Sequence, residues 1–165
     1  MQDLERLMAI EEIKQLKATY FHCVDTKNWK GFLEVFAPDA EFDHRTAFDA
    51  VDPVTGESRV YGRPELLKYI DTSGWRVKGR DALFSMSGDF AAVSTVHHGY
   101  NPRITLHSPD EASGIWAMTD ILRFAEDAPI REIRGYGFYH ETYRKLDGRW
   151  LIQSNTLKRI RVDVQ

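Results

Sequence analysis

The first segment of the chain carries apolar side chains at the spacing of an α-helix. Between Leu4 and Thr26 they recur every three or four residues, charged residues lie opposite them, and no glycine or proline interrupts the pattern. This spacing predicts one long amphipathic helix that packs its apolar stripe against the rest of the chain. The stripe consists of Leu4, Leu7, Met8, Ile13, Leu16, Tyr20 and Val24.

Shorter elements are expected in the next part of the chain. Asn28 is a suitable N-cap for a second helix that Pro38 ends, and residues 40–44 are typical of a short strand. Residues 49–58, with Pro53 and Gly56, are typical of a loop or hairpin turn. The apolar residues of the predicted second helix are Trp29, Phe32, Leu33 and Phe36.

Arg63-Pro64-Glu65 is a favourable start for a third helix, because proline fits the first helical position and glutamate the first turn. That helix carries Leu66, Leu67 and Ile70. Residues 71–90 contain three glycines together with several serines and aspartates, and we expect an irregular segment there.

From residue 94 onward the pattern becomes extended. It predicts strands at 94–106, 112–124, 133–146 and 149–162, and the Asp147-Gly148 pair before the last strand is a strong hairpin signal. Helices followed by long consecutive strands predict an α+β fold, in which a curved antiparallel sheet packs against three N-terminal helices. The length of 165 residues suits a single domain, residues 1–165.

Charge and composition narrow the classes of partner. The formal net charge is −3 with both signs mixed along the chain, which gives no electrostatic reason to expect nucleic acid or an anionic membrane. No apolar run is long enough to span a bilayer, and the N-terminus lacks the basic and apolar regions of a signal peptide. The single cysteine, Cys23, fits a reducing compartment. We therefore expect a cytoplasmic protein.

Asp25 and Tyr20 are the candidate polar groups of the first helix. Asp25 lies at the edge of the apolar stripe, where a carboxylate either faces solvent or reaches into a pocket that the helix closes. Tyr20 lies on the stripe, so its buried hydroxyl needs a hydrogen-bond partner. His97 and His98 are consecutive in a predicted strand and point to opposite faces, so only one of them faces inward.

Asp120 lies within an apolar run of another predicted strand. By alternation it shares a face with Trp116, Met118 and Leu122, and a carboxylate buried among them needs a partner. Arg159 in the last strand is the candidate partner. A structural ion pair and a functional one fit this pattern equally well.

The sequence contains no pattern typical of a metal or cofactor site. The histidines lack the repeated spacing of metal ligands, and the segment 135–137 lacks the strand–turn–helix context of a dinucleotide-binding motif. Cys23 lies in a helical apolar stretch without the features that activate a thiol nucleophile. We expect neither a metal nor an organic cofactor.

Three blocks of the sequence resemble SnoaL-like proteins of the nuclear-transport-factor-2-like superfamily. The first block runs from Ile13 through Tyr20 and Asp25 to Trp29, the second covers 96–105 and 114–120, and the third covers 137–150 and ends at Arg159. The superfamily includes polyketide cyclases, scytalone dehydratase, a lindane dehydrochlorinase and the bile acid 7α-dehydratases. The resemblance implies a cone-shaped sheet packed against the helices.

In the dehydratases of this superfamily, a helix aspartate pairs with a strand histidine, and the match places these roles on Asp25 and His97. The resemblance implies that His97 abstracts a proton while Asp25 holds its ring in the required tautomer. Tyr20, Asp120 and Arg159 match further residues of the bile acid enzymes, so the resemblance places them in the site as well.

Two positions depart from the family pattern. His44 stands where both kinds of dehydratase have a tyrosine, and Leu122 stands where scytalone dehydratase has a second histidine, so we expect a different substrate. Tyr20 and His44 are expected to be hydrogen-bond donors to the substrate. The remaining candidate substrate-binding residues are Trp116, Met118, Leu122 and Tyr139.

The leading hypothesis is a cofactor-independent lyase, a dehydratase that acts on a cyclic, steroid-like or polyketide-like hydroxy-carbonyl compound. A polyketide cyclase or isomerase would use the same base with another substrate pose, and a small-molecule-binding or scaffold module is the non-catalytic alternative. The expected partner is a hydrophobic small molecule. The resemblance also implies a homo-oligomer, a trimer in preference to a dimer, with His98 and His140 on the outer sheet face at its interface.

Overall fold

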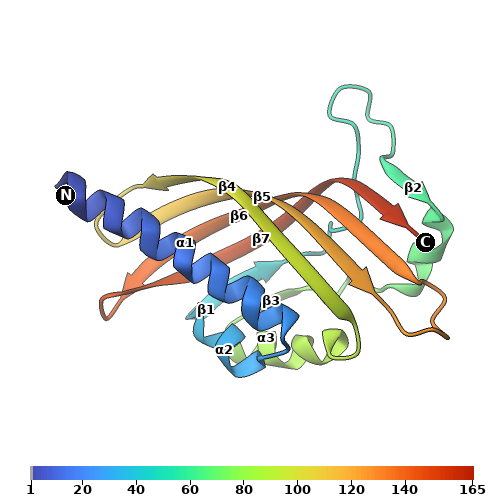
Figure 1. Cartoon of the computed structure of the whole chain (residues 1–165), viewed down its shortest axis with the longest axis horizontal. Coiled ribbons are helices and arrows are strands. Elements are labelled where there is room, and N and C mark those ends of the chain that lie inside the picture. Colours follow the sequence, from blue (N-terminus) through green and yellow to red (C-terminus); the bar gives the residue numbers. More distant parts are fainter. Residues whose placement is uncertain (1) are drawn as a thin grey trace.

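A curved seven-stranded sheet forms most of the molecule (Figure 1). The computed structural model describes residues 2–165, without the side chains of Ser87 and Asp89. The strands follow the order β3-β1-β7-β6-β5-β4, and β2 also pairs with β7. The pairs β1–β7 and β2–β7 are parallel and the other pairs are antiparallel. The strands are β1 (Phe36–Asp43), β2 (Val60–Gly62), β3 (Arg76–Lys78), β4 (Ser94–Leu106), β5 (Glu111–Arg123), β6 (Glu132–Leu146) and β7 (Arg149–Val164).

The four long strands lie close to their predicted ranges. In β5, buried and half-buried residues alternate, which is the pattern of a strand with one face turned to the core. Asp147 and Gly148 join β6 to β7 and have positive φ angles of 50° and 77°, as the two-residue hairpin turn requires. The predicted antiparallel sheet is therefore confirmed for this part of the chain.

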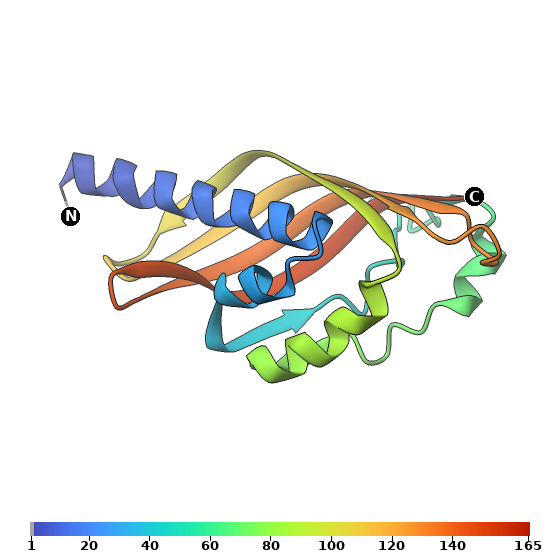
Figure 2. The ribbon, with the colours of Figure 1, turned by 60° about the horizontal axis from the view of Figure 1, so that its bottom comes forward.

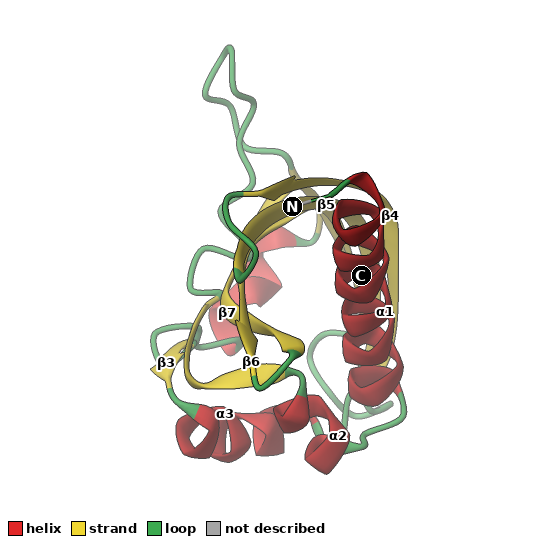
Figure 3. Cartoon of the chain, turned by 90° about the vertical axis from the view of Figure 1, so that its left-hand side faces the viewer, coloured by secondary structure: helices red, strands yellow, loops and turns green. Residues whose placement is uncertain are grey.

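The helices lie inside and below the curve of the sheet. The long helix α1 (Asp3–Asp25) runs along β4, while α2 (Trp29–Glu34) and α3 (Arg80–Ser87) lie at the lower edge of the molecule (Figure 2). Seen from its end, the sheet bends round from β3 to β4 with α1 on its concave side (Figure 3). The predicted α+β class is confirmed.

The apolar stripe of α1 differs from the predicted one. Leu4, Leu7 and Met8 are exposed, because the first turns of α1 project past the end of the sheet (Figure 1). Farther along, α1 buries one charged side chain among its apolar ones. The buried residues of α1 are Ala9, Ile13, Lys17, Tyr20 and Cys23.

Two further predictions are wrong. Phe36 belongs to β1, because α2 ends at Glu34 and Pro38 lies within the strand. Most of residues 71–90 is regular, since β3 pairs with β1 and α3 follows after Gly79, ahead of the short 3₁₀ helix η2 (Gly88–Phe90); only 71–75 remain irregular before β3. A pairing between segments so far apart in sequence leaves no local signal.

The predicted helix at Pro64 is a 3₁₀ helix, η1 (Pro64–Tyr69), so the third α-helix of the fold is α3. Within residues 2–165, we find no helix with the length and apolar character needed to cross a bilayer. His98 is exposed and His140 half-buried, whereas the oligomeric state stays a prediction.

Candidate active site

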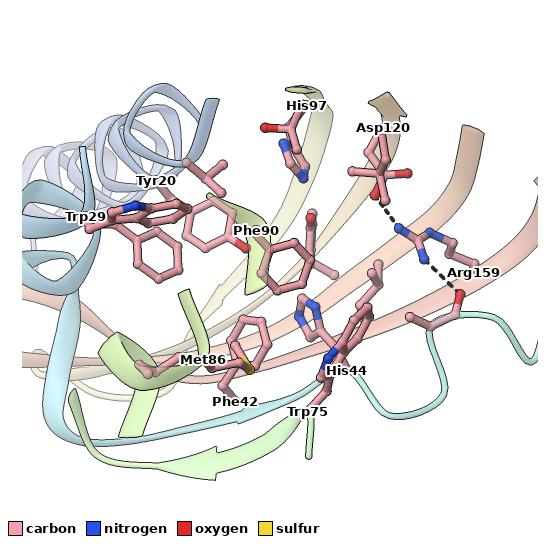
Figure 4. A pocket seen from close by; sticks show the side chains of 18 residues that line it. Tyr20, Trp29, Phe42, His44, Trp75, Met86, Phe90, His97, Asp120 and Arg159 are labelled. Atoms are coloured by element: carbon pink, nitrogen blue, oxygen red, sulfur yellow. Dashed lines mark hydrogen bonds and ion pairs between the residues drawn. The ribbon is translucent and has the colours of Figure 1, made fainter. Parts of the chain in front are cut away.

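A cavity with a volume of about 630 Å³, counting the space at its mouth, lies between the helices and the concave face of the sheet. Small-molecule sites commonly combine apolar walls with a few convergent polar groups. Here the apolar wall includes Trp29, Phe42, Trp75, Met86 and Phe90 (Figure 4). The polar groups come from α1, four strands and the turn after β1, and are Tyr20, His44, Thr95, His97, Asp120, Tyr139 and Arg159.

Asp25 and His97 meet at one wall of this cavity. Asp25 is the last residue of α1, and Asp25 Oδ1 lies 2.6 Å from His97 Nδ1. His97 is paired with Asp120 across β4 and β5, so both project from the concave face. The His97 side chain is 9% exposed, and its ring points into the cavity (Figure 4). The two predicted residues therefore have the geometry of an aspartate–histidine dyad.

Several donors hold the Asp25 carboxylate in place. The Thr95 hydroxyl donates to Asp25 Oδ1 at 2.9 Å, and the His97 backbone N–H donates to Oδ2 at 2.8 Å. Lys27 Nζ donates to Thr95 Oγ1 at 3.0 Å, which leaves the Thr95 hydrogen directed at Asp25. Burial alone raises the pKa of the Asp25 carboxyl, but the hydrogen bonds from His97 and Thr95 outweigh it and keep that pKa below its usual value. The carboxylate is therefore ionised at neutral pH.

The ionised carboxylate decides which nitrogen of His97 carries the hydrogen. A carboxylate only accepts hydrogen bonds, so the neutral ring donates from Nδ1 to Asp25 and keeps its lone pair on Nε2. This is the tautomer that a general base needs. Once Nε2 has taken a proton, the adjacent carboxylate stabilises the imidazolium.

Tyr20 reaches the same cavity from α1, and its hydroxyl forms a hydrogen bond with that of Tyr139. Because two hydroxyls share one hydrogen bond, one hydroxyl hydrogen of the pair is left for another acceptor. Burial raises the pKa of both phenols well above the usual value, so both stay protonated. The predicted need of Tyr20 for a partner is met by Tyr139.

Asp120 and Arg159 form a buried ion pair beside the dyad. Arg159 Nη2 donates to Asp120 Oδ2, and Arg159 Nη1 donates to the Ala47 carbonyl at 3.0 Å. The pair spans β6 at Gly135, where a Cβ atom would lie 2.1 Å from Arg159 Nε and 2.2 Å from Asp120 Oδ1. The lack of a side chain at residue 135 therefore gives the pair its room.

His44 lies just after β1, across the cavity from His97 (Figure 4). Its Nε2 is 2.5 Å from Asn155 Oδ1, while Asn155 Nδ2 donates to Glu141 Oε1. Since the amide hydrogens of Asn155 face a carboxylate, its oxygen faces His44 and accepts the hydrogen of Nε2. Because Asn155 takes the ring hydrogen, this arrangement favours an acceptor role for His44 over the expected donation to a substrate, which stays a prediction.

The candidate substrate-binding residues fall into two groups in the structure. Tyr139 and Leu122 line the cavity, whereas Trp116 and Met118 are buried in the core away from it. The Trp116 indole instead donates to the Tyr143 hydroxyl at 2.7 Å. Strand alternation correctly places both residues on the concave face, but it does not tell which part of that face the helices cover.

The structure adds site residues that the sequence analysis missed. Thr95 lies two positions before His97 on the same strand face, so alternation alone contained that signal. Lys17 lies between Ile13 and Tyr20 on the buried side of α1, where a helical projection places it. Nothing local to Glu141 or Asn155 indicates their pairing. No group of three or more metal-binding side chains is found within the described part of the chain.

Residues 5–156 match the model of the SnoaL-like domain family. The chain belongs to the SnoaL-like domain family. Among curated proteins it is similar to "Probable cyclase FGR4" of Gibberella zeae, with 24% identity over 148 residues that cover 90% of this chain and 89% of the relative.

Solved structures share the fold of this SnoaL-like protein. "Putative Scytalone Dehydratase" from Novosphingobium aromaticivorans superposes with a TM-score of 0.74 at 20% identity, covering 98% of this chain and 90% of the other. Hexachlorocyclohexane dehydrochlorinase LinA-type3 from Novosphingobium barchaimii superposes with a TM-score of 0.72 at 17% identity, covering 99% and 94%. At such identities the likeness establishes the fold alone.

Proposed function

We propose that this SnoaL-like protein is a cofactor-independent lyase that eliminates water from a cyclic hydroxy-carbonyl compound. The observation that carries the proposal is the Asp25–His97 pair, which leaves the His97 Nε2 lone pair beside a largely apolar cavity. The names of two structurally similar proteins, a dehydratase and a dehydrochlorinase, also denote eliminations. Their likeness is consistent with this class of reaction.

The reaction starts with proton abstraction. His97 Nε2 removes a hydrogen from the carbon next to the carbonyl, and the negative charge moves to the carbonyl oxygen as an enolate. The hydroxyl hydrogen left by the Tyr20–Tyr139 pair stabilises this oxygen. Asp25 remains ionised and stabilises the imidazolium.

The second step breaks the carbon–oxygen bond on the next carbon. The electron pair of the enolate forms the new carbon–carbon double bond, and the leaving hydroxyl takes the proton from His97 Nε2. The products are water and an unsaturated carbonyl compound, and His97 returns to its starting tautomer. The protein needs to supply only a base that takes and returns one proton and a donor for the enolate oxygen. His97 and the Tyr20–Tyr139 pair are the residues proposed for these two tasks.

Cyclisation is the second candidate function, because the relative with 24% identity over most of the chain is described as a probable cyclase. An aldol-type ring closure uses the same base and the same enolate, which then attacks a second carbonyl group. The two reactions differ in the substrate that the cavity admits.

The test uses 3-hydroxy-1-tetralone, a bicyclic β-hydroxy ketone that loses water to give fluorescent 1-naphthol. We expect turnover by the wild-type protein and a loss of about 10²–10⁴-fold in the variants His97→Gln and His97→Ala. His98→Gln is the matched control, since its side chain is exposed outside the site. Deuterium exchange at the α-carbon of 1-tetralone measures proton abstraction by itself. Equal turnover by wild type and His97→Gln would contradict the proposal, and rates no higher than background in both would favour a binding module.

A further inference from the structure

His44 is fixed in position on the wall opposite the dyad. Its ring stacks on Phe42 with the ring centroids 3.7 Å apart, and its Nε2 is bound to Asn155 on β7. His44 lines the cavity, and its other ring nitrogen, Nδ1, has no hydrogen-bond partner within the described part of the chain. A ligand in the cavity therefore meets a ring of fixed orientation.

A chain of directed hydrogen bonds behind His44 fixes its tautomer. Glu141 is fully buried and accepts from Lys17 Nζ at 2.6 Å and from the Tyr143 hydroxyl at 2.5 Å, as well as from Asn155 Nδ2. The Glu141 carboxylate only accepts hydrogen bonds, so the amide nitrogen of Asn155 must face it and the amide has only one orientation. Asn155 Oδ1 faces His44, and the ring hydrogen must lie on Nε2.

The charges around His44 keep its ring neutral. The pKa of His44 is lowered to about 3, mainly by burial, against which the hydrogen bond to Asn155 acts only in part. The positive charges of Arg159 and Lys17, together with His97, contribute to this lowering of the pKa. Among the side chains that the structure describes, no carboxylate hydrogen-bonds to this ring to stabilise an imidazolium, in contrast to His97. Nδ1 therefore carries a lone pair throughout the neutral pH range.

We propose that His44 is a specificity-determining residue, whose Nδ1 accepts a hydrogen bond from the substrate and so selects compounds that place a hydroxyl group against this wall. A carbonyl or ether oxygen at the same place would set two acceptors against each other and leave both unpaired. The inference rests on the proposed function in one respect, namely that the substrate occupies this cavity. It adds a second hydroxyl group, apart from the reacting one, to the expected substrate.

The tautomer is tested in the wild-type protein by ¹⁵N NMR of the histidine rings, with signals assigned through scalar and NOE connectivities. We expect the His44 Nδ1 signal to be that of an unprotonated nitrogen and the Nε2 signal that of an N–H, unchanged between pH 8 and pH 5. Addition of 1-naphthol should move the Nδ1 signal toward the hydrogen-bonded range, and 1-fluoronaphthalene should not. A protonated Nδ1, or an Nδ1 signal that 1-naphthol leaves unchanged, overturns the proposal.

The affinities of wild type and variants for the same two probes show which residue causes the preference for a hydroxyl group. 1-Fluoronaphthalene is close in shape to 1-naphthol but has no hydrogen to donate, and one neutral hydrogen bond corresponds to a preference of about 2- to 12-fold. We expect wild type to prefer 1-naphthol, His44→Phe to lose the preference and His97→Ala to keep it. Loss in His97→Ala with retention in His44→Phe would overturn the proposal and assign the hydroxyl to the dyad.

These binding results are independent of turnover. If His97→Gln left the dehydration of 3-hydroxy-1-tetralone unchanged, the proposed function would fail, while the preference for 1-naphthol would still report on His44. If turnover required His97 but His44→Phe kept the full preference, only the specificity role would fail.

Discussion

Two histidines face one cavity, and their partners make them chemically different. His97 donates from Nδ1 to the Asp25 carboxylate, while His44 donates from Nε2 to the neutral amide of Asn155. A carboxylate partner stabilises a protonated ring, and an amide partner does not. The pKa of His44 is lowered to about 3, mainly by burial, and no carboxylate of the described part of the chain hydrogen-bonds to its ring. The charge of the residue behind each ring therefore decides which histidine is suited to proton transfer and which to hydrogen-bond recognition.

The two partners also lie in different parts of the fold. Asp25 is the last residue of α1, where neighbouring strand β4 supplies the donors that hold a carboxylate. Asn155 lies within β7, fully buried beside Glu141. A carboxylate in place of the Asn155 amide would need a cation of its own at that depth. Lys17 cannot serve as this cation, because it is already paired with Glu141.

The largest expected effect comes from giving His97 the kind of partner that His44 has. In Asp25→Asn, the side-chain oxygen can accept from the His97 backbone N–H while the amide nitrogen donates to Nδ1, which moves the ring hydrogen to Nε2. We expect dehydration of 3-hydroxy-1-tetralone to fall by about 10²–10⁴-fold. The thermal midpoint should fall modestly, because the amide nitrogen does not accept the hydrogen that Thr95 donates to Asp25 Oδ1. Activity within a few-fold of wild type would contradict the assigned tautomer.

The next largest effect concerns the support of His44. Glu141→Gln leaves the fully buried Lys17 ammonium without its counter-ion, and breaking a buried pair in this way costs about 3–5 kcal/mol of unfolding free energy. Urea unfolding measures the change. The double variant Lys17→Met with Glu141→Gln should recover part of the loss, since no buried charge remains.

Glu41→Gln is the matched control for that experiment. Glu41 pairs with Lys78 at the surface, where both side chains are at least half exposed. Such a pair contributes about 0–1 kcal/mol. If Glu41→Gln lost as much unfolding free energy as Glu141→Gln, burial of the ion pair would not be what makes its loss costly.

The pH dependence of the unfolding free energy tests the neutral state of His44 in another way. The pKa of His44 falls from an ordinary 6.5 to about 3 in the folded protein, so between these values the unfolded chain binds a proton that the folded chain does not. Unfolding free energy should fall as the pH falls through this window, by up to about 1.4 kcal/mol per pH unit. Asp25 adds a loss in the same direction at lower pH, as its lowered pKa is approached.

His44→Phe removes the first of these contributions. We expect urea unfolding at pH 7, 6, 5 and 4 to show a smaller slope in this variant than in the wild type. Parallel curves would mean that His44 takes up its proton in the folded protein, against the neutral ring that the specificity role requires.

The smallest expected effect concerns the buried Asp120–Arg159 ion pair, which lines the same cavity as His97 and His44. Gly135→Ala puts a Cβ atom where Arg159 Nε and Asp120 Oδ1 now lie, and crowding of this kind costs about 1–3 kcal/mol. Gly74→Ala is the control, because a Cβ there meets no atom within 4 Å. Equal unfolding free energies for the two variants, measured in urea, would show that the pair can shift without cost.

The sequence by itself determined the layout of the fold. Helical spacing and the Asn28 cap located the first two helices, and alternation with the Asp147-Gly148 turn located the long strands. These signals are local, since a side chain's direction follows from its position in a helix or strand. The same reasoning, joined to a family resemblance, brought Asp25, His97, Tyr20, Asp120 and Arg159 to one site.

Only the tertiary structure decided what each polar group binds. Strand β3 pairs with β1 across more than thirty intervening residues, and Glu141 joins Lys17 to Asn155 across three elements, so no local pattern predicts these contacts. Burial then sets the chemistry, because a group removed from water depends entirely on its few neighbours. For this reason the sequence indicated two candidate histidines, and only the packing decided that one is bound to a carboxylate and the other to an amide.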